Sequence, residues 1–221
     1  MRTTEITEEI SVAKMVARNQ WATYEMIEHY LKNNGYKIIG TGSYSETYAK
    51  ANETFVIKVA YLPDRTWLKF VELTHTDKAN PHFPKISRVR RYASEDGYAF
   101  IAFVERLAPI TTDTPDIHLL AAYMINLIGN LPDDKFAASS IKRRHRLFWN
   151  DYTYSIARKK WEENENLLHT LCAEFERKYP RFVGTIQTVI QNAGEHTIDL
   201  HDENIMVRPR DNTFVIMDPY S

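Results

Sequence analysis

The spacing of hydrophobic residues changes along the chain and predicts three regions of different structure. Over residues 5–34 apolar side chains recur every three or four positions, as on one face of a helix, and Gly35 is a suitable helix end. From 36 to 104 they fall in short β-branched and aromatic runs, which indicate strands. From about 115 to 193 the helical spacing returns. The pattern therefore predicts an N-terminal helical part, a sheet and a mainly helical part.

The strand region is predicted to form one antiparallel sheet of five strands with a helix inserted. Asp96-Gly97, between two apolar runs, is a strong hairpin signal. Asn52 is a turn residue between the second and third runs. The expected elements, in chain order, are strands at 36–42, 44–48 and 54–61, a helix at 66–75, and strands at 86–93 and 97–104.

Two short apolar runs near the end of the chain predict a further hairpin. Residues 204–208 and 213–218 are the expected strands, and P-R-D-N joins them. With the turn centred at Asp211, Asn204 and Asp218 face each other at the open end of this hairpin. An amide oxygen and a carboxylate oxygen placed in this way suit Mg²⁺ that also binds phosphates. We therefore expect these two residues to hold a metal ion.

Composition and charge narrow the class of protein. The chain has 221 residues, which fits one domain of good size or a small two-lobed one, and its net charge of −1 gives no global attraction to nucleic acid or membranes. The single cysteine, Cys172, excludes an internal disulfide framework and a Cys-rich zinc site, and suits a reducing cytoplasm. No apolar run approaches the length of a membrane span. The basic run at 142–146 fits a solvated helix face, with a partner or acidic-substrate surface as the alternative.

A glycine-rich loop, G-T-G-S-Y-S at 40–45, joins the first two predicted strands. Glycine permits a tight turn and lets backbone N–H groups approach a phosphate closely. The strand–turn–strand setting differs from the strand-to-helix setting of a P-loop or a dinucleotide-binding fingerprint. A plain β-turn is the alternative interpretation of this loop.

Lys58 lies in the middle of F-V-I-K-V-A, where its neighbours are of the buried type. Strand alternation puts Lys58 on one face with Val56 and Ala60. One interpretation is a lysine that extends along an edge strand into solvent. The other is a cation held beneath the glycine loop to meet phosphate oxygens.

The polar loop D-L-H-D-E-N, residues 199–204, precedes the C-terminal hairpin and concentrates two aspartates, a histidine and an asparagine. A metal cluster, a polar turn and a phosphate-handling loop are all compatible with these residues. A metal cluster is the weakest of the three, because His196 fits a helix cap or a surface position and Cys172 is too isolated to add a ligand.

Taken together and in this order, these parts resemble a protein kinase. The glycine loop, the lysine of F-V-I-K, the D-L-H-D-E-N loop and the D-P-Y aspartate correspond to the kinase signature set. The chain is similar in particular to the early host-shut-off protein kinases of short-tailed lytic bacteriophages. Those proteins also carry a serine in the third glycine position, a V-I-K lysine, a D-x-H-x-x-N-I-M loop, and Asp-Pro where most kinases have Asp-Phe-Gly. The resemblance covers about 35–221.

The resemblance implies an α+β, protein-kinase-like, two-lobed fold with ATP in the cleft. The domains would be an N-terminal helical extension at 1–34, a small lobe at 35–107 built on the five-stranded antiparallel sheet, and a mainly helical, truncated large lobe at 108–221. Three residues follow Asp218 in this sequence. We therefore expect a minimal large lobe without an activation segment.

The resemblance also implies a role for each matching residue. Asp199 would accept the substrate hydroxyl proton while His201 supports the γ-phosphate. Lys58 would hold the α- and β-phosphates, and Asn204 and Asp218 would hold Mg²⁺. The backbone of V-E-R-L at 104–107 would form the hinge that bonds the adenine. The residues expected to bind ATP are Ile39, Gly40, Thr41, Gly42, Ser43, Tyr44, Ser45, Val56, Lys58, Glu105 and Leu107.

The sequence departs from most protein kinases at several of these positions. Ser45 replaces the third glycine, which stiffens the loop. Thr197 and Ile198 stand where most protein kinases have His-Arg, which argues against regulation by an activation-loop phosphate. His201 replaces the usual lysine. Glu72 is the best candidate for the helix glutamate that pairs with the strand lysine.

The expected function is an ATP-dependent serine/threonine protein kinase that acts on host proteins, including those of transcription and translation, and on itself, in the host cell cytoplasm. No membrane or direct nucleic-acid partner is expected, and a homodimer stays open. One alternative is a small-molecule phosphotransferase of the aminoglycoside kinase type, although those enzymes usually have a larger C-terminal part. Another is a non-catalytic kinase-fold module that binds a host protein. The joint presence of Lys58, Asp199, Asn204 and Asp218 argues against this last alternative.

Overall fold

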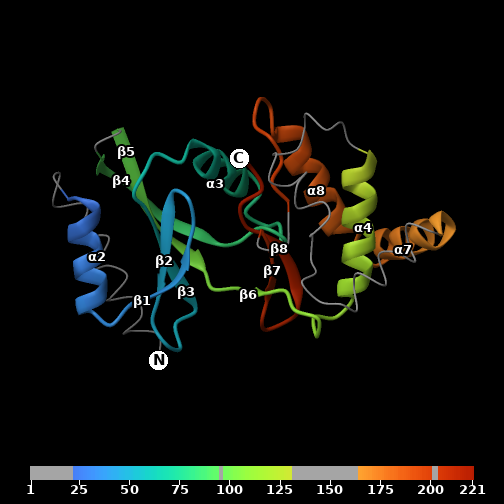
Figure 1. Ribbon diagram of the computed structural model, residues 1–221, viewed down its shortest axis with the longest axis horizontal. Coiled ribbons are helices and arrows are strands. Elements are labelled where there is room, and N and C mark those ends of the chain that lie inside the picture. The colour runs from blue at the N-terminus through green and yellow to red at the C-terminus, as the bar shows by residue number, and fades with distance from the viewer. Residues whose placement is uncertain (1–21, 95–96, 131–163, 201–203) are drawn as a thin grey trace. The chain divides into compact units, whose positions relative to one another are not determined.

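The computed structural model describes residues 22–94, 97–130, 164–200 and 204–221, and its chain divides into two compact units (Figure 1). The first unit contains the chain up to Lys78 and returns for Pro84–Arg106. The second contains Ala79–Phe83 and the chain from Leu107 onward. Most of the predicted first helix, Asp96, the basic run at 142–146 and His201 lie outside the described residues.

The first unit is built on an antiparallel sheet of five strands, in the order β1-β2-β3-β5-β4. The prediction of five strands with one helix inserted between the third and the fourth is confirmed. The strands are β1 (Lys37–Thr41), β2 (Ser45–Ala49), β3 (Phe55–Ala60), β4 (Ile86–Ser94) and β5 (Gly97–Glu105). Gly97 opens β5 with a φ of 124°, a left-handed backbone that suits glycine.

Two helices cover opposite faces of this sheet. Helix α2 (Tyr24–Asn33) contacts the face that carries Tyr48, because the Tyr24 and Tyr48 hydroxyls meet at 3.1 Å. Helix α3 (Arg65–Thr76) covers the other face, where Trp67 stacks on Phe100 at 4.4 Å between ring centroids (Figure 1). Both helices begin at side-chain caps, which satisfy N–H groups that the first helical turn leaves unbonded.

The second unit combines three described helices with a small sheet. The helices are α4 (Ile117–Asn130), α7 (Glu165–Lys178) and α8 (Pro180–Asn192), and the sheet has the order β6 (Ala108–Pro109), β7 (Ile205–Arg208), β8 (Thr213–Ile216). Aromatic rings form its core, with Phe175, Phe182 and Phe214 in mutual contact at 5.6–6.3 Å. The two-residue strand β6 was not predicted, because a run of that length carries no periodicity. No described helix has the length and hydropathy of a membrane span.

The short segment Ala79–Phe83 packs within the second unit, although the chain on both sides of it belongs to the first. The His82 ring donates Nδ1–H to the Phe214 carbonyl at 2.8 Å, and the His82 carbonyl accepts from the Ile216 N–H at 2.9 Å. The buried Arg208 guanidinium donates to the Pro81 carbonyl at 2.8 Å. These bonds fasten the segment to the β7–β8 hairpin.

The predicted α+β class is confirmed. A five-stranded antiparallel sheet with a helix after its third strand, followed by helices and a C-terminal hairpin, is the element order expected of a protein-kinase-like fold.

Candidate active site

The glycine loop is a tight connection between β1 and β2 in the first unit. The Gly42 N–H donates to the Ser45 carbonyl at 2.8 Å and closes the turn. The pairing of β1 with β2 shifts in register between Ile38 and Gly40, so β1 bulges at Ile39. Ile39 is 53% exposed. Tyr44, at the tip, is also exposed. The loop therefore presents backbone and apolar side chains to solvent.

A row of directly paired residues connects the glycine loop to the predicted lysine. Gly40 pairs with Thr47, Thr47 with Lys58, and Lys58 with Ala102. Paired residues of antiparallel strands project to the same face, so Gly40 and Lys58 share one face of the sheet. A Cβ on Gly40 would meet nothing nearer than 3.9 Å, and neither Gly40 nor Gly42 has a positive φ. Backbone strain and packing therefore do not explain the glycine at position 40.

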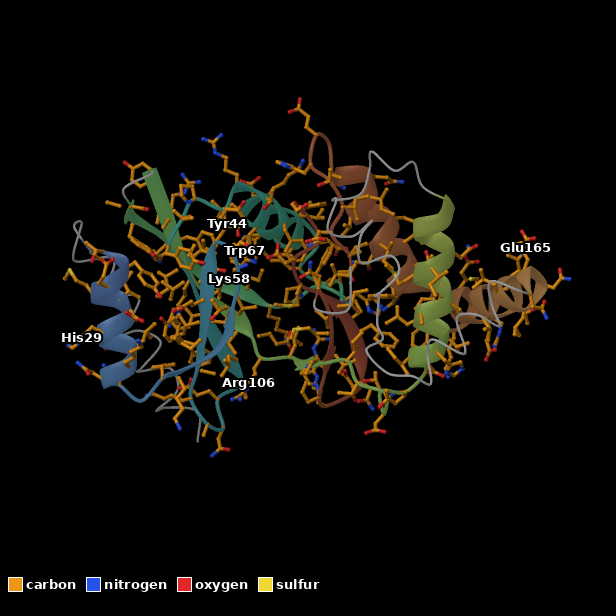
Figure 2. The ribbon with its side chains drawn as sticks, in the orientation of Figure 1. His29, Tyr44, Lys58, Trp67, Arg106 and Glu165 are labelled. Carbon is orange, nitrogen blue, oxygen red and sulfur yellow. The ribbon has the colours of Figure 1, made fainter. Side chains whose placement is uncertain are left out.

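Lys58 is held in a buried ion pair on this face. Its Nζ lies 4.0 Å from Asp64 Oδ2 and 4.7 Å from the centre of the Trp67 ring (Figure 2). The Lys58 side chain is only 13% exposed, so the interpretation as a lysine extending into solvent is wrong. The carboxylate beside Lys58 is that of Asp64, whereas Glu72 was the candidate named from the sequence. Glu72 lies on the exposed side of α3, whereas Asp64 is the buried residue that caps α3.

The expected hinge residues Glu105 and Leu107 fall at the end of the first unit and at the start of the second, whereas Val56 lies in β3. Val56 is buried in β3 and pairs with Val104. The Glu105 N–H donates to the Lys85 carbonyl at 2.8 Å, so this N–H group is already used within the sheet. Leu107 begins the second unit.

In the second unit, the start of the predicted catalytic loop is fixed by its neighbours. Ile198 and Leu200 are completely buried, and the alternation leaves Asp199 between them partly exposed. The Asp199 N–H donates to the Pro219 carbonyl at 2.7 Å, and Ile198 forms a β-bridge with Tyr220. The loop is thus paired with the segment that immediately follows Asp218.

Asn204 closes this arrangement from the other end of the loop. The side-chain Nδ2 of Asn204 donates to the Asp199 backbone carbonyl at 2.7 Å, and the backbone carbonyl of Asn204 accepts from the Met217 N–H at 2.9 Å. Asn204 therefore touches the chain beside both Asp199 and Asp218. The structure brings these three predicted residues together at the open end of the β7–β8 hairpin.

The register of this hairpin differs by one residue from the predicted one. Ile205 pairs with Ile216 and Arg208 with Thr213, so Met217 rather than Asp218 is opposite Asn204. The cause lies in the turn. Asn212 adopts a left-handed φ of 54° and its N–H donates to the Arg208 carbonyl, so the turn contains four residues and has no residue at its centre.

The segment after Asp218 is anchored by a buried tyrosine. The Tyr220 hydroxyl donates to the Val189 carbonyl at 2.9 Å, and burial raises the pKa of Tyr220 to about 12. The phenol therefore stays protonated and remains a donor at physiological pH. His196, which we expected at a cap or on the surface, lies beside Tyr220, with 6.4 Å between the centroids of the two rings.

Two residues of the site in the first unit, Asp64 and Tyr61, were not predicted from the sequence. Asp64 carries a recognisable signal, since an aspartate immediately before a predicted helix is a typical N-cap. Tyr61, whose hydroxyl donates to the Gly42 carbonyl of the glycine loop, carries none, because this contact depends on the fold. His201 lies outside the described residues, and within the described ranges no group of His, Cys, Asp and Glu is arranged as a metal cluster.

Comparisons with known proteins add a structural similarity. No protein-family model matches the sequence, and no curated protein matches it. Among solved structures the chain is similar to spectinomycin phosphotransferase APH(9)-Ia in complex with ADP and spectinomycin, with 15% sequence identity and a TM-score of 0.32. The similarity covers 83% of this chain and 62% of the phosphotransferase, so this chain spans about three fifths of that protein.

Proposed function

We propose that the protein is an ATP-dependent kinase that transfers the γ-phosphoryl group to a serine or threonine hydroxyl of a protein. The observation that supports this most directly is the junction of Asp199, Asn204 and the backbone around Asp218 in the second unit. A base, an amide ligand and a carboxylate ligand at one hairpin end are the groups that phosphoryl transfer requires.

The first unit supplies groups suited to the nucleotide. Phosphate oxygens accept hydrogen bonds and carry negative charge, and Lys58 offers a cation on the same face as Gly40. A residue without a side chain at position 40 leaves that face open to a ligand. Val56 and Ile39 provide apolar surface for the adenine ring.

The second unit supplies groups that fit Mg²⁺, which prefers oxygen ligands. The bond from the Asn204 Nδ2 to the Asp199 carbonyl orients the side-chain amide, and the amide oxygen of Asn204 would be the metal ligand. Asp218 adds a carboxylate. When bound, Mg²⁺ would neutralise phosphate charge, and the residues of the chain would then act by positioning the reactants.

Asp199 would act as the base. The burial of Ile198 and Leu200 and the Pro219 carbonyl fix its backbone, while its side chain stays partly exposed. Its carboxylate would orient the substrate hydroxyl and accept its proton as the phosphoryl group transfers.

The substrate class rests on the resemblance to the phage host-shut-off kinases. It suggests host proteins, including those of transcription and translation, and the enzyme itself, in the cytoplasm of an infected cell. Small-molecule phosphotransfer is the second candidate, and the experiment below distinguishes the two by the acceptor that becomes labelled.

The test is transfer of label from γ-labelled ATP with Mg²⁺, first to proteins of a bacterial lysate and then to aminoglycosides. We expect labelled serine and threonine in protein. Asp218→Asn and Asn204→Ala should each lower the rate of phosphoryl transfer by about two orders of magnitude or more. Each variant weakens the binding of the Mg²⁺ that would neutralise the phosphate charge. Asp211→Asn, at the other end of the same hairpin, is the matched control and should retain activity. Wild-type transfer by Asp218→Asn with an unchanged melting temperature would contradict the assignment, and label in aminoglycosides alone would favour the small-molecule alternative.

A further inference from the structure

The tip of the glycine loop is bonded to the residue that follows β3. The Tyr61 hydroxyl donates to the Gly42 carbonyl at 2.6 Å, and the Tyr61 N–H donates to the Tyr44 carbonyl at 3.0 Å. Two carbonyls of the loop are therefore directed towards one residue of the neighbouring strand end.

This bond also fixes the direction of an N–H group. In a trans peptide the C=O and the N–H of one unit point in opposite directions, and the described residues contain no cis peptide. The Gly42 carbonyl and the Ser43 N–H belong to the same unit. When Tyr61 holds the carbonyl, the Ser43 N–H must point away from Tyr61.

Tyr61 is itself braced by helix α2. The Tyr24 ring meets the Tyr61 ring edge-on, at 5.6 Å between centroids and an interplanar angle of 75°. Tyr24 is fixed in turn, because its hydroxyl donates to the Glu46 carboxylate, which also accepts from the Tyr48 hydroxyl at 2.5 Å. Burial raises the pKa of Tyr24 and of Tyr48, so both phenols remain protonated donors.

The two faces of the sheet give this arrangement a direction. Tyr48 pairs with Ile57, so it lies on the face opposite to that of Lys58. Helix α2 and Tyr24 therefore lie on the face away from Lys58. The Gly42 carbonyl is drawn towards α2, and the Ser43 N–H is turned towards the Lys58 face.

We infer that Tyr61 is a positioning residue of the glycine loop and that α2 supports it through Tyr24. This inference rests on the proposed function, because it assigns the Ser43 N–H to a phosphate of the bound nucleotide. Phosphate oxygens only accept hydrogen bonds, so a loop that presented the Gly42 carbonyl instead would repel them. On this view α2 is part of the nucleotide-binding unit.

The variant Tyr61→Phe tests the inference in the full chain, since it removes one hydroxyl and keeps the ring against Tyr24. We expect ADP to bind about two- to tenfold more weakly, the effect of losing one ordinary hydrogen bond. Amide hydrogen exchange at residues 42–44, measured without nucleotide, should accelerate by a similar factor. The melting temperature should change little. Tyr98→Phe, which alters a tyrosine that is 69% exposed in the same sheet, is the matched control.

A second pair of variants tests the brace. Tyr24→Phe keeps the ring that contacts Tyr61, whereas Tyr24→Leu removes it. We expect loop exchange to accelerate more in Tyr24→Leu than in Tyr24→Phe. Equal exchange in these two variants would overturn the role of α2.

The outcomes also separate this inference from the proposed function. If the wild-type chain binds ADP and Tyr61→Phe binds it as tightly as Tyr98→Phe does, the positioning role is overturned while nucleotide binding stands. If the wild-type chain binds neither ADP nor ATP with Mg²⁺, the proposed function is overturned, and the inference that rests on it is overturned too.

Discussion

At the scale of the residue, Asp64 uses its two carboxylate oxygens for different tasks. Oδ1 caps helix α3, accepting from the Trp67 N–H at 2.9 Å, and Oδ2 faces the Lys58 ammonium at 4.0 Å. The sequence predicted Lys58 because a lysine among buried β residues is unusual. It did not predict the partner, because pairing across the space between a strand and a helix start leaves no periodic signal. Glu72, the candidate named from the sequence, lies on the exposed side of α3.

Asp64→Asn separates these two tasks. Asparagine caps helices as well as aspartate does, and both Asp64→Asn and Asp64→Ala remove the carboxylate charge from beside Lys58. The two variants therefore differ by the cap, and the free energy of unfolding should be about 1 kcal/mol lower for Asp64→Ala than for Asp64→Asn. Asp64→Asn nevertheless removes the charge that positions Lys58, and we expect kcat/KM for ATP to fall roughly tenfold, or about 1.4 kcal/mol. Urea unfolding and steady-state kinetics measure the two effects. Glu72→Gln is the matched control, and an equal loss of activity in both variants would refute the role of Asp64.

At the scale of the element, both strands of the β7–β8 hairpin were predicted from the sequence, but their register was not. Two apolar runs joined by P-R-D-N were enough to predict both strands and to place Asn204 and Asp218 at their open end. The left-handed backbone of Asn212 then set the register one residue away from the predicted one. Turn conformation depends on the backbone angles of single residues, which composition does not determine, so the sequence predicted the hairpin and not its exact pairing.

The burial of His82 beside this hairpin makes stability depend on pH. Burial lowers the pKa of His82 below its usual value of 6.5. The positive charge of nearby Arg208 acts in the same direction, and the bond to the Phe214 carbonyl acts in the opposite direction. The unfolded chain therefore binds this proton more readily than the folded one. As far as His82 is concerned, the free energy of unfolding has its full value above about pH 6.5. It falls as the pH decreases from there, by up to about 1.4 kcal/mol per pH unit.

His82→Asn should reduce that slope, because it keeps a neutral donor near the position of Nδ1 and removes the titrating ring. The slope is measured from the free energies of urea unfolding at pH 5.5, 6.5 and 7.5. His29→Asn, which alters an exposed histidine on α2, is the control (Figure 2). If His82→Asn lost stability towards pH 5.5 as steeply as the wild type, another group would be responsible for the dependence.

At the scale of the whole molecule, the division into units does not follow the order of the chain. Periodicity predicted the sheet region and the helical region correctly, since each element carries its own pattern. It gave no sign that Ala79–Phe83, lying between α3 and β4, belongs with the second unit. N-P-H-F-P resembles an ordinary rigid connection in sequence, and its packing against Phe214 and Arg208 depends on residues more than 120 positions away.

Because of this division, the second unit should need Ala79–Phe83 to be complete. A fragment of residues 107–221 lacks Ala79–Phe83, so Arg208 loses its acceptor on Pro81 and the Ile216 N–H loses the His82 carbonyl. Each buried group left without such a partner costs about 1–3 kcal/mol, and domains are stable by only about 5–15 kcal/mol. We therefore expect the fragment to unfold at much lower urea concentration than the same fragment with residues 79–84 joined to its N-terminus by a flexible linker. The matched control carries the linked segment with Asn80, His82 and Phe83 replaced by glycine. It keeps the backbone carbonyls but loses the side chains that hold the segment in place, including the His82 ring that donates to the Phe214 carbonyl, so its midpoint should lie below that of the linked fragment. Circular dichroism during urea titration measures all three. Equal midpoints for the bare and the linked fragments would show that the second unit is complete from Leu107 onward.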